Sequence, residues 1–143
     1  MDAKDLYDLI LSTYPSVTEG AICDLHKPCS KHRECSIKLS NKYIDFDAVE
    51  TEFDRGRVSR PSVDAVKNAG HYFCFIEIKG WKKYLEWNTP SEKGIQEQAE
   101  YDLKGKLETS EEICVAISGQ HNIFRQIPEV FILVTDIDVS EQG

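Results

Sequence analysis

Apolar residues recur at helical spacing near the start of the chain and gather in shorter, denser runs further on. Leu9 and Ile10 lie three and four residues after Leu6. That spacing places them on one face of a helix, and Pro15 is a residue that helices do not continue through. We therefore predict an amphipathic helix over residues 5–14.

The middle of the chain carries patterns typical of strands. Residues 42–51 mix aromatic and β-branched side chains, and residues 62–67 and 71–79 are two further β-rich runs. The last two runs are separated by Asn68-Ala69-Gly70. Asn and Gly adopt the positive φ angles of tight turns easily, so we predict that these two runs form an antiparallel hairpin.

Helical spacing returns over residues 90–117, where apolar side chains recur every four residues at Ile95, Ala99, Leu103 and Leu107. This predicts one long helix, or two helices with a break between residues 105 and 110. A final apolar run over residues 129–137 predicts a strand. The element order is helix, three strands, helix, strand, which indicates an α/β fold with a mixed sheet flanked by helices. No repeat or linker divides the chain, so we expect one domain over residues 1–143.

Composition and charge narrow the function. The chain of 143 residues has a net charge of −8, which argues against coating nucleic acid by bulk electrostatics. The charge is uneven: residues 55–83 hold seven basic and two acidic residues, whereas residues 84–143 hold four basic and twelve acidic residues. No apolar run is long enough to cross a membrane and residues 1–8 are acidic, so we predict a cytoplasmic protein with no membrane partner.

The candidate chemistry lies on the predicted hairpin. Side chains alternate between the two faces of a strand, so Glu77 and Lys79 point to the same face of an apolar strand. Antiparallel pairing can bring Asp64 beside Glu77. Two carboxylates on adjacent strands are suitable ligands for Mg²⁺ or Mn²⁺, and Lys79 could orient or deprotonate an attacking water.

The run Arg60-Pro-Ser-Val-Asp64, followed after twelve intervening residues by Glu77-Ile-Lys79, resembles the PD-(D/E)XK superfamily of restriction-endonuclease-like nucleases. The predicted αβββαβ order is similar to that family's core. The resemblance implies a metal-dependent nuclease that hydrolyses phosphodiester bonds of DNA, with RNA as another candidate substrate. It implies that Asp64, Glu77 and the backbone carbonyl of Ile78 bind Mg²⁺ or Mn²⁺, and that Lys79 serves the water.

The sequence also departs from the family pattern. Proline stands at position 61 and not directly before Asp64. Many members have a further carboxylate near the metal, for which the candidates here are Glu50, Glu52, Asp8 and Glu19, with Glu50 as our first candidate. Some exonuclease-like members carry a Gln followed by Tyr on the helix after the motif strand, which makes Gln98 a weaker candidate.

The irregular, Cys/His-rich segment at residues 19–40 offers a second group of ligands. A thiol or imidazole recurs at every third position, at Cys23, His26, Cys29, His32 and Cys35. These are the ligands that zinc favours, so a structural zinc site is one interpretation. The other is that the cysteines pack as small apolar side chains and the histidines are solvated.

The basic residues of segment 55–83, here called the basic strip, suggest the partners. We predict that nucleic acid, DNA first, contacts Arg55, Arg57, Arg60, Lys82 and Lys83. A domain this small covers little duplex, so a homodimer or a larger protein complex would extend its contact. The alternative is a catalytically inactive nuclease-like domain that serves as a binding or assembly module, because an acidic surface can dock a protein partner.

Overall fold

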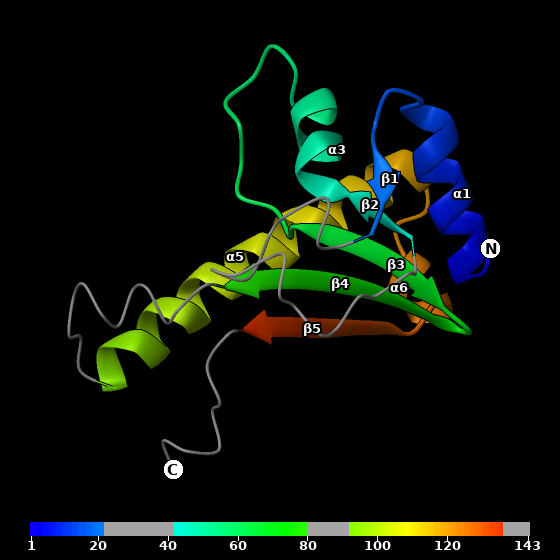
Figure 1. Ribbon diagram of the computed structural model, residues 1–143. Coiled ribbons are helices and arrows are strands. Elements are labelled where there is room, and N and C mark those ends of the chain that lie inside the picture. The colour runs from blue at the N-terminus through cyan, green and yellow to red at the C-terminus, as the bar shows by residue number, and fades with distance from the viewer. Residues whose placement is uncertain (22–41, 80–91, 136–143) are drawn as a thin grey trace.

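The computed structural model describes residues 1–21, 42–79 and 92–135 of the chain; at positions 79, 92–102 and 135 it describes the backbone alone. Within these residues the fold is α/β, with five strands in one mixed sheet and helices packed against it (Figure 1). The strand order is β1-β2-β3-β4-β5. The predicted α/β class with a mixed sheet flanked by helices is therefore confirmed.

The first helix, α1, covers Ala3–Thr13 and begins two residues before the prediction. A capping box fixes its start: the Asp5 N–H donates to Asp2 Oδ1 at 2.8 Å, and the Asp2 N–H donates to Asp5 Oδ2 at 3.0 Å. Leu6 and Ile10 of its apolar face are fully buried. α1 therefore contributes one side of the core.

The segment predicted as one strand over residues 42–51 changes structure part-way. Strand β1 (Glu19–Gly20) pairs antiparallel with β2 (Tyr43–Asp45), and helix α3 (Phe46–Phe53) follows at once. Asp45 is the N-cap, because its side chain accepts a bond from the Ala48 N–H. Most of the predicted strand is thus a helix, and its buried residues Phe46, Val49 and Glu50 have helical spacing.

The predicted hairpin is present with a shifted turn. Strands β3 (Ala65–Ala69) and β4 (Tyr72–Lys79) pair antiparallel from Ala65↔Ile76 to Ala69↔Tyr72. The two residues of the turn are therefore Gly70 and His71, not residues 68–70, and Gly70 has a φ of 60°. Residues 62–64 precede the strand and are not part of it.

The long helix is continuous. α5 runs over Glu92–Ser118 without a break at Gly105, and the short helix α6 (Ile123–Gln126), which the sequence pattern did not predict, follows it. Strand β5 (Glu129–Thr135) then pairs parallel with β4. A parallel pair needs a crossover connection, and α5 with α6 supplies it.

The main core lies between one face of the sheet and helices α1, α3, α5 and α6 (Figure 1). Phe73 and Phe75 point to this face and pack edge-to-face at 5.2 Å between ring centroids. Cys74 and Ile76 point to the opposite face and belong to a smaller cluster. In the described part of the chain, no helix is both long and apolar enough to span a membrane.

Candidate metal and phosphate site

Asp64 is held in place through its backbone and its side chain. Its carbonyl accepts a hydrogen bond from the Phe46 N–H at 3.0 Å, where β2 passes into α3. The preceding residue, Val63, donates its N–H to Ser110 Oγ of α5 at 3.0 Å. The Asp64 carboxylate accepts a hydrogen bond from the Ile78 N–H at 2.7 Å, which joins it directly to β4.

Glu77 faces the helical side of the sheet. It follows Phe73 and Phe75 at two-residue spacing, and its exposed fraction is only 1%. Ala65 pairs with Ile76, so one further step of the same register sets Asp64 opposite Glu77. The two carboxyl groups lie within hydrogen-bonding reach of each other. The structure therefore brings together the two carboxylates on which the sequence hypothesis depends.

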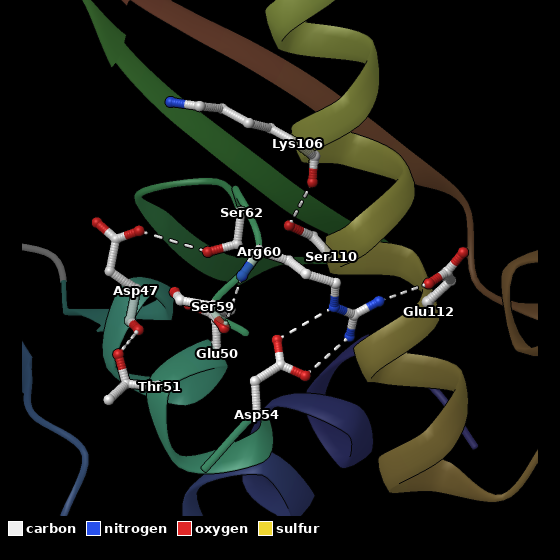
Figure 2. A network of polar contacts seen from close by, with 10 residues as sticks. All are labelled: Asp47, Glu50, Thr51, Asp54, Ser59, Arg60, Ser62, Lys106, Ser110 and Glu112. Carbon is white, nitrogen blue, oxygen red and sulfur yellow. Dashed lines mark hydrogen bonds and ion pairs between the residues drawn. The ribbon is translucent and has the colours of Figure 1, made fainter. Parts of the chain in front are cut away.

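Lys106 of α5 is the third charged residue at this position, and the sequence did not point to it. Its ammonium lies 2.9 Å from Glu77 Oε1, and its side chain is 17% exposed. One turn later, Ser110 Oγ donates to the Lys106 carbonyl at 2.7 Å (Figure 2). Because Ser110 also accepts from Val63, the same helix turn positions both Lys106 and the segment that carries Asp64.

The electrostatics of the pair are unusual. The pKa of Glu77 is raised to about 8, chiefly by burial and also by the neighbouring Asp64, whereas Lys106 acts in the opposite direction. Glu77 Oε2 is buried and has no hydrogen-bond partner among the described residues. A buried carboxylate oxygen without a partner is costly, and it is an oxygen that a bound cation would satisfy.

These residues fit a divalent cation in part. Mg²⁺ is commonly held by one or two protein carboxylates, with water and phosphate oxygens completing its octahedron, and Asp64 and Glu77 supply that number. The N–H and C=O of one strand residue point the same way, so the Ile78 carbonyl is directed to the side of β4 on which Asp64 lies. Among the described residues, no group of three or more His, Cys, Asp or Glu side chains could hold a metal ion.

Glu50, our first candidate for a further metal ligand, is engaged elsewhere. It is 4% exposed and lies on α3. Its Oε1 accepts from Ser59 Oγ at 2.6 Å and its Oε2 accepts from the Arg60 N–H at 3.2 Å (Figure 2). Both oxygens thus hold the loop between α3 and β3.

Arg60 is committed to ion pairs, and the other two arginines of the strip are exposed. Nε and Nη2 of Arg60 donate to Asp54 at 3.1 and 3.2 Å, and Nη1 donates to Glu112 of α5 at 2.8 Å (Figure 2). The Arg60 guanidinium lowers the pKa of Asp54, which is 4% exposed. Arg55 pairs with Glu52 at the surface, and Arg57 is exposed. Within the described residues, Arg55 and Arg57 are therefore better placed than Arg60 to meet a phosphate.

Several predicted residues fall outside the described part of the structure. They are the five candidate zinc ligands (Cys23, His26, Cys29, His32 and Cys35), Lys82 and Lys83, and the side chains of Lys79 and Gln98. The backbone of Lys79 is described: it ends β4, opposite Thr135 of β5. Two of the five cysteines are described, and Cys74 and Cys114 are both buried free thiols.

Comparisons with known proteins add nothing to the geometry of the site. No family model matches the chain, and no curated protein or solved structure matches it either.

Proposed function

We propose that this protein is a metal-dependent phosphodiesterase that cleaves nucleic acid, with DNA as the first substrate to test. The observation that carries the proposal is the meeting of Asp64, just before β3, with Glu77 of β4, where Glu77 Oε2 is buried and unpartnered among the described residues. In a fold that could have placed apolar side chains here, two adjacent carboxylates are a costly arrangement, and such arrangements gather at functional sites.

The roles of the chain's own residues follow from this geometry. Asp64 and Glu77 would hold Mg²⁺ or Mn²⁺, with the Ile78 carbonyl as a further oxygen on the same side. When bound, the cation supplies charge for the phosphate and lowers the pKa of a coordinated water. Lys79, two residues beyond Glu77, is proposed to orient that water. The water oxygen would attack phosphorus and give up one proton to solvent, the bond to the leaving sugar oxygen would break, and the leaving oxygen would take up a proton from solvent.

The Lys106–Glu77 pair supports a second candidate function. An ammonium already lies on Glu77 Oε1 at 2.9 Å, as a resident cation would in a site that no longer binds metal. On this alternative the chain is a catalytically inactive nuclease-like domain that binds or assembles with partners. The two candidates differ in whether Glu77 Oε2 receives a metal.

Cleavage of labelled single-stranded, duplex and branched DNA and RNA, with Mg²⁺ or Mn²⁺, tests the proposal. The wild type should cut at least one substrate, and Asp64→Ala and Lys79→Ala should lose most of that activity. Glu108→Ala is the matched control, because Glu108 is an exposed carboxylate on α5 that is no candidate for the site. A wild type that cuts nothing would favour the inactive module, and activity that survives both site substitutions would place the chemistry elsewhere.

A further inference from the structure

A groove lies where the end of α5 meets α6, and none of the residues that line it is part of the proposed catalytic site. It has a volume of about 670 Å³. Val115 and Ala116 of α5 and Phe124 of α6 form its apolar part. Glu111 and Glu112 line it from α5, and Arg125 lines it from α6. An apolar groove between charged walls is the form that proteins use to receive an apolar side chain of a partner.

The α5 wall has more negative charge than its surroundings neutralise. Glu111 lies within hydrogen-bonding reach of Glu129 and close to Glu108. The last turn of α5 contains no basic residue, so the negative end of a 27-residue helix adds to these carboxylates. Of these carboxylates Arg60 pairs with Glu112, at 2.8 Å, and it shares its single charge with Asp54.

The pair Glu111 and Glu129 shows this excess of negative charge. Burial and the neighbouring Glu129 raise the pKa of Glu111 to about 7, because two adjacent carboxylates resist being charged together. A cation brought to this wall would let both ionise. This points to a basic partner and not to a second copy of the chain, since Glu108, Glu111, Glu112 and Glu129 outnumber Arg60 and Arg125 and two such surfaces would repel each other.

We propose that the α5–α6 groove is a docking site for a basic, amphipathic segment of a partner protein, which inserts an apolar side chain over Ala116 and places a Lys or Arg against Glu111. Arg125, on the opposite wall, meets the other side of the segment and sets its direction. The site is independent of the proposed nuclease function, because none of its lining residues takes part in that chemistry.

The test is a titration of the full isotope-labelled chain with a short amphipathic peptide of Leu, Ala and Lys, followed by amide NMR shifts. A second peptide has Glu in place of every Lys. We expect the Lys peptide to shift the amides that line the groove, and the Glu peptide to leave them unmoved. Binding of both peptides, or shifts spread over the acidic surface in general, would overturn the proposal.

Variants separate the contribution of charge pairing at Glu111 from that of the apolar side chain inserted over Ala116. Glu111→Lys should lower the affinity for the Lys peptide roughly five-fold or more, which corresponds to about 1 kcal/mol of lost charge pairing. Glu52→Lys makes the same change of charge on α3, outside the groove, and should lower the affinity for the Lys peptide less. Ala116→Trp fills the groove at an exposed helix position without changing charge, and should abolish binding. Equal weakening by the two Lys variants, unchanged binding by Ala116→Trp, or self-association of the chain that Ala116→Trp removes would each overturn the proposal.

Discussion

Asp64 Oδ2 accepts a hydrogen bond from the backbone N–H of Ile78 at 2.7 Å, so the carboxylate is joined to the strand that carries Glu77. A side chain held in this way loses little further freedom when it binds a ligand, which is the condition for a preorganised site. The same bond directs Asp64 toward the end of β4, where Lys79 follows. The relative positions of these residues therefore do not depend on a long loop.

Mn²⁺ should stabilise the wild type and should fail to stabilise variants of the carboxylate pair. A ligand that binds only the folded state raises the melting temperature with its concentration. Glu77→Gln and Asp64→Asn keep the side-chain shape but remove the charge that binds the ion, so both should lose the shift. Glu108→Gln, a change at an exposed carboxylate of α5, should retain it. Thermal melts with increasing Mn²⁺ measure this, and a shift that persists in both site variants would show that the ion binds elsewhere.

Lys106→Met should destabilise the protein and weaken Mn²⁺ binding. The change leaves Glu77, which is 1% exposed, without its ion pair. It also removes the cation that lowers the pKa of Glu77, so that Glu77 is held more firmly in the protonated form, which does not bind Mn²⁺. We expect a loss of roughly 1–3 kcal/mol in the free energy of unfolding, because Glu77 can take up a proton and so escape the full cost of a buried charge. Denaturant melts and Mn²⁺ titration by electron paramagnetic resonance measure the two effects.

Lys106→Arg and Lys104→Met are the controls for that variant. Arg keeps the positive charge next to Glu77 and should recover part of both effects, whereas Lys104 is an exposed residue of the same helix and its substitution should be neutral. Tighter Mn²⁺ binding by Lys106→Met would show that Lys106 competes with the ion. That result would support the inactive module, in which the lysine occupies the cation's place.

The sequence could predict the hairpin because its signals are local. Alternation of side chains and a glycine suited to positive φ specify two antiparallel strands, and their pairing then sets Asp64 opposite Glu77. The predicted turn was wrong by two residues at its start and by one at its end. Asn68 tolerates a positive φ but lies in β3 opposite Phe73, and cross-strand pairing determines which residues are left to turn.

Tertiary contacts decided what the sequence could not. Phe46 and Val49 fit either a strand or a helix, and the Asp45 cap together with burial against the core selects the helix. Lys106 has no local signal, since its partner Glu77 lies 29 residues away. Arg60 was predicted to meet nucleic acid from its charge, but the sequence does not reveal that Asp54 and Glu112 surround it.

Arg60→Ala should destabilise the fold without reporting on nucleic acid. The change leaves the Asp54 carboxylate buried without its two-pronged partner, and we expect a loss of about 2–3 kcal/mol in the free energy of unfolding. Arg60→Lys should be intermediate, because an ammonium cannot reproduce the two parallel bonds. Arg57→Ala is the exposed control and should change stability by no more than about 0.5 kcal/mol. Equal stability of the Arg60→Ala and Arg57→Ala proteins in denaturant melts would contradict the role of the network.

Glu111→Gln should stabilise the protein at alkaline pH and not at acid pH. In the fold, the pKa of Glu111 rises from its ordinary 4.5 to about 7. Between those two values the folded protein binds a proton more tightly than the unfolded chain, so the free energy of unfolding falls as pH rises through this window. Gln mimics the protonated carboxyl and removes that loss.

The melting temperature of Glu111→Gln should therefore match that of the wild type near about pH 4 and exceed it near about pH 8. Glu77, whose pKa is also raised, titrates in both proteins and cancels in the difference. Glu112→Gln, at the neighbouring position, is the control. The Glu112 carboxylate is stabilised by its ion pair with Arg60, so removing its charge should not stabilise the protein at alkaline pH. A pH-independent difference between Glu111→Gln and the wild type would mean that Glu111 and Glu129 do not compete for a proton. The excess negative charge that defines the α5 side of the groove would then be absent, so this measurement also tests the electrostatic basis of the docking site.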